Sequence, residues 1–287
     1  MFGAKANRIA LTVALGALAL APRIWAAGPS GEAVGASHSA KANVAESRAV
    51  RASRAIGMDV RGRHGEAVGQ VRDLLVNTQT GLVRYVVLSR GRDTVGGERV
   101  APVPVTRLRL GPARQSLVYE GTLERLEKAT VQQPDWSERN LQDPDRLSQV
   151  DKTWGLQQRT VARLVRPVSP LLGQAVMNPA GAPIGEIEDL VLHINQAKGS
   201  YAVLKLARNA SGDDKRIAVP LRALSSGAGP QALTLRMDAA RLLALKGFSR
   251  EAYQNPNDPA FLAEATRHLG AFSSGPAAGT PENESRQ

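Results

Sequence analysis

The chain contains an internal repeat, and this repeat restricts the folds open to it more than any other feature. The sequence matches itself when it is shifted by 116 residues. The coinciding positions include two Gly-x-x-x-Gly spacings, an Asp-Leu pair, a tyrosine and a Val-Pro pair. They are Gly65, Gly69, Asp73, Leu74, Tyr85, Val103 and Pro104 in the first copy, and Gly181, Gly185, Asp189, Leu190, Tyr201, Val219 and Pro220 in the second. So much agreement at one offset indicates a duplication of one small domain.

Each copy has the pattern of short β-strands joined by turns. Apolar residues alternate in part along residues 66–76 and 183–194, as expected of strands with one buried face. Tyr85 and Tyr201 lie in the apolar runs that follow, and we expect both in or at the edge of a core. Because proline cannot donate to a ladder, each Val-Pro pair should end a strand. Five or six strands in about 75 residues leave no room for crossover helices, which favours a small barrel.

The alternation changes phase near the aspartate that the two copies share. A β-bulge produces such a slip, and we expect Asp73 and Asp189 to accept backbone N–H bonds there. The alternative is a pair of catalytic carboxylates formed by Glu186 and Glu188 beside Asp189, which requires one carboxyl with a raised pKa in an apolar pocket. Only the aspartate recurs in both copies, so we favour a solvated strand face for the glutamates and a structural role for the aspartates.

These residues resemble a known family. The first copy reads Gly-Glu-x-x-Gly-x-Val-x-Asp-Leu-x-Val, then a turn, then Val-x-Tyr-Val-Val-Leu and finally Val-Pro-Val. This pattern is similar to the PRC-barrel, a domain named for the H subunit of the photosynthetic reaction centre. The resemblance covers roughly residues 55–130 and 170–250, and the second copy departs from it at the turn 179–183. It implies a protein-interaction module with no shared catalytic residues.

The expected fold is mainly β, with two tandem small PRC-like β-barrels, short flanking helices and a partly helical linker. The predicted segments are a signal peptide at 1–26, a flexible lead-in at 27–54, the first barrel at 55–131, a linker with a helix at 132–170, the second barrel at 171–250, a C-terminal helical segment at 251–272 and a disordered tail at 273–287. The short helices should follow the barrel cores at 122–128 and 239–246.

Two longer helices are expected outside the barrels. Residues 145–165 of the linker have apolar side chains near helical spacing, and Trp154 could fasten this helix to a barrel. The alternative for the linker region is a surface groove that accepts a helix of a partner. The second helix opens with Asp-Pro at residues 258–259, a good helix start. It should pack Phe261 and Leu262 on the second barrel.

The N-terminus has the layout of a secretory signal peptide. Lys5 and Arg8 precede an apolar run of 13 residues at 9–21, and cleavage is expected after Ala26 or Ala27. The run is shorter than the roughly 20 residues that span a bilayer. We therefore expect an exported, periplasmic protein without a membrane span in its mature chain. The alternative is an uncleaved anchor.

The sequence offers few residues for catalysis or for cofactors. It has no cysteine, which excludes disulfides, iron–sulfur clusters, zinc sites with cysteine ligands and thiol nucleophiles. Its histidines are scattered, without the spacing of zinc ligands, at His38, His64, His193 and His268. We therefore predict no catalytic, cofactor-binding or metal-binding residue, and no enzyme activity.

The charge balance bears on possible partners. The net charge is +11, and the three cationic residues before Ala27 contribute to it, so +8 remains from that point on. Such an excess attracts polyanions, or it reflects arginines dispersed over the surface. Aromatic residues make up only 4%, which argues against nucleic acid, because single-strand binders stack bases on aromatic rings.

Three functional classes follow from the sequence. The favoured one is a scaffold that binds another envelope protein. The second is an electrostatic binder of anionic lipid or another polyanion, and the third is an enzyme with an unrecognised site. Clustering of the first copy's arginines on one face would favour the second class, and dispersal would favour the first. These arginines are Arg61, Arg63, Arg72, Arg84, Arg90 and Arg92.

Overall fold

The computed structural model describes residues 49–94, 96–111, 114–132, 144–157, 164–194, 199–207, 215–226, 232–237 and 239–273. The predicted signal peptide, most of the lead-in and nearly all of the predicted tail lie outside these residues. Within them, no helix is both long enough and apolar enough to cross a membrane.

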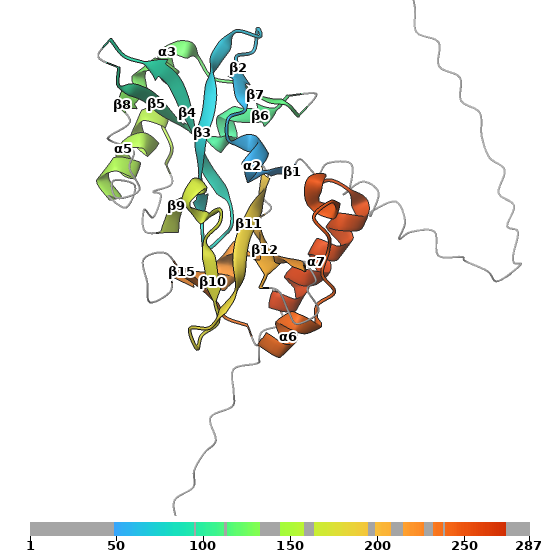
Figure 1. The fold of residues 1–287 in the computed structure, drawn as a ribbon. Coiled ribbons are helices and arrows are strands. Elements are labelled where there is room, and N and C mark those ends of the chain that lie inside the picture. The colour runs from blue at the N-terminus through green and yellow to red at the C-terminus, as the bar shows by residue number, and fades with distance from the viewer. Residues whose placement is uncertain are drawn as a thin grey trace, which may run out of the picture. The chain divides into compact units, whose positions relative to one another are not determined.

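The fold is mainly β, with one sheet for each copy of the repeat (Figure 1). We call residues 55–131 the first repeat and residues 171–250 the second repeat. Strands of the first are β2 (Asp59–Arg61), β3 (Ala67–Asn77), β4 (Val83–Arg92), β5 (Glu98–Pro104), β6 (Leu108–Leu110), β7 (Ser116–Tyr119) and β8 (Val131–Gln132). Strands of the second are β10 (Ala175–Met177), β11 (Pro183–His193), β12 (Tyr201–Leu206), β13 (Arg216–Pro220), β14 (Leu224–Ser226) and β15 (Ala232–Leu235).

The two sheets have the same strand order. The path β6-β7-β2-β3-β4-β5 in the first repeat corresponds to β14-β15-β10-β11-β12-β13 in the second. In both, the short second strand of this path pairs in parallel with the third, β7 with β2 and β15 with β10. As expected, Pro104 and Pro220 end their strands, and a 3-10 turn follows each, η1 (Val105–Arg107) and η5 (Leu221–Ala223). The two copies of the repeated sequence therefore form sheets with the same strand order and connections.

A close approach between strands explains one pair of shared glycines. Gly69 and Gly185 lie near the start of the long strands β3 and β11, beside the neighbouring strand. A Cβ at Gly69 would lie 2.4 Å from the backbone oxygen of Ser89, and one at Gly185 would lie 2.2 Å from that of Lys205. No other residue fits these positions without moving the neighbouring backbone. The repeat therefore keeps glycine there for steric reasons.

The predicted bulges are present. The pairing of β3 with β4 shifts register between Val71 and Asp73, and that of β11 with β12 shifts between Ile187 and Asp189. Each aspartate accepts the backbone N–H of the following leucine, at 2.7 Å for Asp73 and 2.8 Å for Asp189. The phase change in the sequence was thus a correct indication of a bulge stabilised by aspartate.

Each repeat receives a strand from the segment that precedes the other repeat. β1 (Ala49–Arg51) lies before the first repeat but pairs with β11 of the second. β9 (Val165–Pro167) lies before the second repeat but pairs with β3 of the first. The registers are equivalent, because Arg51 faces Val191 and Pro167 faces Leu75. We call residues 49–55 and 165–171 the interlock segments.

The bulge aspartates fasten the interlock segments. Asp73 accepts the backbone N–H of Val168 at 3.2 Å and of Ser169 at 3.1 Å. Ser169 begins the 3-10 turn η4 (Ser169–Leu171). Burial raises the pKa of Asp73, and the hydrogen bonds from the backbone oppose this shift. One carboxylate thus bonds its own bulge and the segment that leads into the other repeat.

Asp189 holds the other interlock segment in the same way. Its Oδ1 accepts the N–H of Ser53 at 3.1 Å, and its Oδ2 accepts the Ser53 hydroxyl at 2.5 Å. Ser53 lies in the short helix α2 (Ala52–Ala55). Arg51 adds an ion pair to Asp189 at 3.7 Å. Ser53 and Ser169 are equivalent positions of the repeat, so the two aspartates hold equivalent residues of the two interlock segments.

Two expectations about the segments before the repeats are therefore wrong. Residues 49–54 were assigned to a flexible lead-in, because they are rich in small residues, yet they form β1 and most of α2. The helix expected at 145–165 is shorter: α5 (Pro144–Trp154) ends before Gly155, which has a φ of 67°, and residues 165–167 form β9. In both cases partners distant in the sequence fix the structure, which a local pattern does not show.

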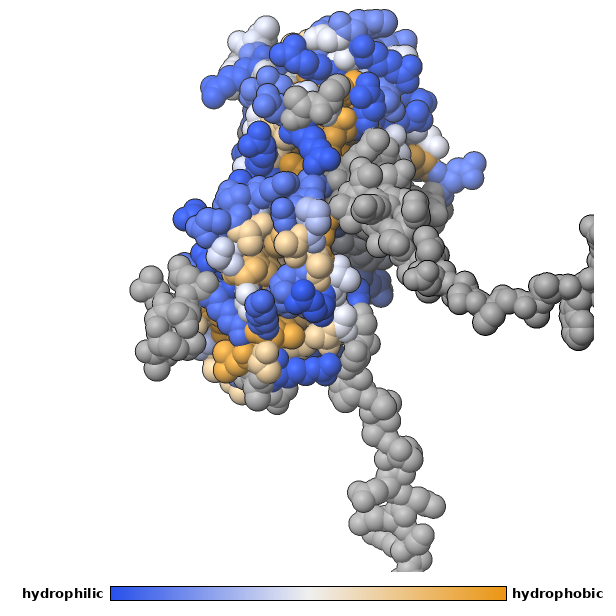
Figure 2. All heavy atoms as spheres, turned by 90° about the vertical axis from the view of Figure 1, so that its right-hand side faces the viewer, coloured by the Kyte–Doolittle hydropathy of each residue, from blue (hydrophilic) through white to orange (hydrophobic). Residues whose placement is uncertain are grey.

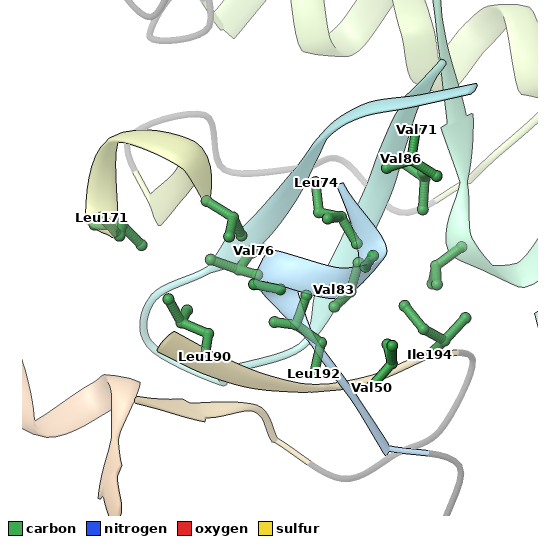
Figure 3. Packing of buried hydrophobic residues seen from close by; sticks show 14 of the residues in the cluster. Val50, Val71, Leu74, Val76, Val83, Val86, Leu171, Leu190, Leu192 and Ile194 are labelled. Atoms are coloured by element: carbon green, nitrogen blue, oxygen red, sulfur yellow. The ribbon is translucent and has the colours of Figure 1, made fainter. Parts of the chain in front are cut away.

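The two repeats share one core. Figure 3 shows side chains of both around the interlock, with Val76 and Val83 of the first repeat near Leu190 and Leu192 of the second. Val50 of an interlock segment belongs to the same buried cluster. The turns of the two long hairpins also meet, because the N–H of Ser200 donates to the oxygen of Gly81 at 2.6 Å. The repeats are therefore packed as one unit.

Helix α5 covers the outer face of the first repeat. As expected, Trp154 is buried and fastens this helix, with its indole N–H donating to the oxygen of Pro102 at 2.7 Å. Tyr85 is fully buried beneath α5, and its hydroxyl donates to Oδ1 of Asp151.

The short helix α3 (Leu123–Lys128) begins at Thr122, whose hydroxyl accepts from Arg125 N–H.

Helix α7 (Pro259–Ser273) covers the outer face of the second repeat. It begins as expected, because Asp258 accepts the N–H groups of Ala260 and Phe261, and Phe261 is buried on the second repeat. His268 fastens the helix further along: its Nδ1 accepts the N–H of Ala218 at 3.1 Å. The chain between the sheet and α7 includes α6 (Ala239–Ala244) and η6 (Ala252–Gln254).

Replacing Asp73 by alanine should lower the free energy of unfolding by about 1–3 kcal/mol, because buried backbone N–H groups lose their acceptor. Asp189→Ala should cost a similar amount. Asp59→Ala is a suitable control, because Asp59 is exposed and bonds only the Gln70 side chain. Urea denaturation measures the three values. Equal stability of Asp73→Ala and Asp59→Ala would contradict the fastening role.

The stability should fall as the pH drops below neutral, because His268 is buried as a neutral ring. Burial lowers its pKa below the ordinary value of 6.5. The folded state therefore binds the proton less readily than the unfolded state, so the stability is complete above pH 6.5 and is lost as the pH falls through the folded pKa. The melting temperature between pH 7.5 and 5 measures this slope.

The same titration separates His268 from the other histidines. His268→Gln should flatten the dependence of the melting temperature on pH, because glutamine does not titrate. His64→Gln is the matched control, because His64 is exposed in a turn. An equal slope in both variants would mean that another group causes the loss.

Candidate functional site

The carboxylates considered for acid/base catalysis have structural partners. Glu188 binds the guanidinium of Arg216, which is 3% exposed. Oε1 of Glu188 also lies 3.7 Å from Nε of Arg250. Glu186 forms an ion pair with Lys205 at 3.5 Å. Asp189, as described above, fastens an interlock segment. The geometry therefore uses these carboxylates to hold strands and helices together.

The histidines do not converge. His64 is exposed in a turn, His193 is buried at the end of β11, and His268 is a buried residue of α7. His38 lies outside the described residues. Within the described ranges, no three residues of the metal-ligating types form a group that could hold an ion.

The arginines of the first repeat have separate partners. Arg72 pairs with Glu98 at 3.5 Å and Arg90 with Glu127 at 3.4 Å. Arg61 donates to the oxygen of Gly65 at 3.2 Å. These three therefore do not combine into one free basic surface. Arg63 differs, because it lines a groove together with arginines that the sequence did not single out.

This groove has a volume of about 640 Å³ and lies at the end of the first repeat where α3 begins. We call it the arginine groove. Its cations are Arg63, Arg107 and Arg125, and none of the three forms an ion pair within the described part of the chain. The remaining lining residues are His64, Glu66, Glu120, Gly121, Thr122, Leu123 and Trp154.

Both carboxylates of the arginine groove are already engaged. Glu120 pairs with Arg109 at 2.9 Å, outside the groove lining. Glu66 accepts the N–H of His64 at 3.0 Å. The buried Tyr119 beside the groove has its pKa raised by burial, and the positive charges of Arg107 and Arg125 are among those opposing this shift. The groove therefore presents guanidinium groups that a bound anion could neutralise.

The second repeat serves as an internal comparison for this groove. At the offset of the repeat, Arg107 corresponds to Ala223 and Arg63 to Pro179. The second repeat forms the same strands without these arginines. They are thus not required by the fold. Differences of this kind between the copies were visible in the sequence, but only the structure shows that Arg63, Arg107 and Arg125 converge.

Comparison with known proteins identifies a family for part of the chain. Residues 48–113 match the PRC-barrel domain. The match includes the interlock segment before the first repeat and most of that repeat, and it does not reach the second. No curated protein matches the chain. The likeness of the second repeat to the first rests on the sequence offset and the identical strand order.

Glu188→Ala should lower the free energy of unfolding by about 3 kcal/mol, because it removes a carboxylate that binds the buried guanidinium of Arg216. Glu186→Ala on the same strand should change it by less than about 0.5 kcal/mol, because the Glu186–Lys205 pair is exposed. Thermal and urea denaturation measure both. A small effect at Glu188 would show that it has no structural role.

Proposed function

We propose that the chain is a non-catalytic scaffold of the bacterial envelope, which binds an acidic segment of a partner protein in the arginine groove. The observation that carries this proposal is the convergence of Arg63, Arg107 and Arg125 around one hollow. Guanidinium groups bind carboxylates through paired hydrogen bonds, so a segment rich in Asp or Glu complements them. Leu123, at the rim, is 49% exposed and offers an apolar contact beside the charges.

The two repeats take different roles in this proposal. On the face drawn in Figure 2, hydrophilic residues dominate over the first repeat, whereas hydrophobic residues are mixed with hydrophilic ones over the lower part, on the side where α7 lies. We propose that both repeats are PRC-barrels, that the second has kept the fold and that the first has acquired the groove. The shared core fixes the second repeat against the first, so a partner held by one is held by the whole unit.

Export and location are part of the same proposal. The N-terminal cationic residues and apolar run favour secretion, so the partner is expected to be a periplasmic or membrane-anchored protein. A second candidate is the anionic surface of a membrane, which the charge of +8 after the leader favours. The two candidates differ in how strongly they respond to salt, because paired guanidinium–carboxylate hydrogen bonds with an apolar contact at Leu123 persist at an ionic strength that screens attraction to a diffuse anionic surface.

Photo-crosslinking in cells tests the groove directly. A photoreactive phenylalanine replaces Leu123 of the groove, and the control replaces Leu243, an exposed leucine on α6 of the second repeat. The proposal expects protein adducts at position 123, retained at high salt and absent at position 243. Adducts that disappear in an Arg107→Glu, Arg125→Glu double variant would locate the contact. Equal adducts at both positions would contradict it.

A labelled peptide of alternating glutamate and alanine measures the affinity in vitro. The double variant should weaken its binding about tenfold, which corresponds to about 1.4 kcal/mol. The matched control is Arg241→Glu, at the position of the second repeat that corresponds to Arg125, and it should leave the affinity unchanged. If the peptide does not bind but phosphatidylglycerol vesicles do, and high salt releases them, the membrane candidate replaces the protein partner.

A further inference from the structure

A buried tyrosine occupies the same position in each repeat. Tyr85 lies opposite Pro104 in the ladder of β4 and β5, and Tyr201 lies opposite Pro220 in the ladder of β12 and β13. Both are at the outer face of their sheet, beneath the covering helix, and are at most 3% exposed. Because the two tyrosines occupy equivalent ladder positions, Tyr85 shows which hydrogen-bond partner this fold can supply to the tyrosine hydroxyl.

The two hydroxyl groups differ in their partners. That of Tyr85 donates to the carboxylate of Asp151 on α5. That of Tyr201 has no hydrogen-bond partner among the described residues. Buried hydroxyl groups nearly always have one, because leaving water without a replacement bond is unfavourable. The second repeat thus leaves open the place that a carboxylate fills in the first.

Tyr201 lines a cavity of about 450 Å³, which differs from the arginine groove in every lining residue. The adjacent Ser200 also lines it, is 3% exposed and has a hydroxyl without a partner in the described residues. Further lining side chains come from the turn of the first repeat, from the second repeat and from α7. They include Thr80, His193, Arg222, Leu262, Ala265 and Leu269.

We propose that this cavity binds a small organic carboxylate. Its carboxylate accepts the hydroxyl protons of Tyr201 and Ser200, as Asp151 accepts that of Tyr85. Arg222 supplies a positive charge to the site, and the hydrocarbon part of the ligand contacts the apolar side of α7. The volume lies in the range of small-molecule sites, which combine apolar walls with a few polar groups. Burial raises the pKa of Tyr201, so the hydroxyl remains a donor at neutral pH.

Benzoate and hexanoate are the probes, with their methyl esters as controls that lack the charged oxygens. They are added at millimolar concentrations to the exported chain labelled with ¹⁵N, and amide shifts are recorded by NMR. The proposal expects saturable shifts at Ser200, Tyr201 and Ala265 with at least one of the acids and none with its ester. No binding by either acid, equal binding by the esters, or shifts confined to residues outside this cavity, such as those of the arginine groove, would overturn it.

A matched pair of variants separates binding from folding. Tyr201→Phe should weaken binding of the acid about tenfold without lowering the melting temperature, because it removes a hydroxyl that has no partner. Tyr85→Phe should leave binding unchanged and lower the melting temperature, because it removes a buried hydroxyl that donates to Asp151. If Tyr201→Phe lowers the melting temperature and binds as the parent chain does, Tyr201 is structural and the proposal fails. The arginine groove is intact in both variants, so this result is independent of the scaffold function.

Discussion

The rest of the structure depends on the hydrogen bonds of two bulge aspartates. A bulge leaves backbone groups unpaired in a ladder, and an interlock segment brings further N–H groups into the same region. Asp73 and Asp189 accept both sets, each joining its own strand to the segment that leads into the other repeat. Because buried donors require acceptors, each carboxylate links strand pairing, bulge and interlock segment in the folded chain. The shared core then follows from the position of β1 and β9.

The duplicated fold allows one repeat to act as a control for the other. Positions with the same residue in both repeats have a structural role. Gly69 and Gly185 allow a close approach of the neighbouring backbone, and Asp73 and Asp189 accept backbone N–H groups. Features that differ are free to serve binding: Arg107 stands where the second repeat has alanine, and Tyr201 lacks the partner that Tyr85 has. Each proposed site contains a residue at which the two repeats differ. The arginine groove belongs to the first repeat, whereas the cavity contains Tyr201 of the second repeat together with residues of both repeats and α7, so the two copies have diverged.

The sequence predicted the local structure of the repeats well, because strands, prolines and the bulge leave a pattern with a short period. It also predicted the burial of Tyr85, Tyr201 and Trp154 from their apolar surroundings. It failed for the interlock segments, because residues 49–54 are rich in alanine and their partners lie more than a hundred residues away. The arginine groove and the cavity were missed for the same reason: their residues converge only after the sheets have formed.

The exchange of interlock segments has a consequence for the history of the gene. A molecule with a single repeat could complete its sheet only by taking the segment of a second molecule, which describes a symmetric homodimer. Joining two such genes end to end would keep every pairing while turning two identical subunits into one chain. From then on, a mutation would alter one half alone. Two identical subunits must carry the same residues at every position, whereas the halves of a fused chain can differ. A fusion therefore accounts for an arginine groove in the first repeat that the second repeat lacks.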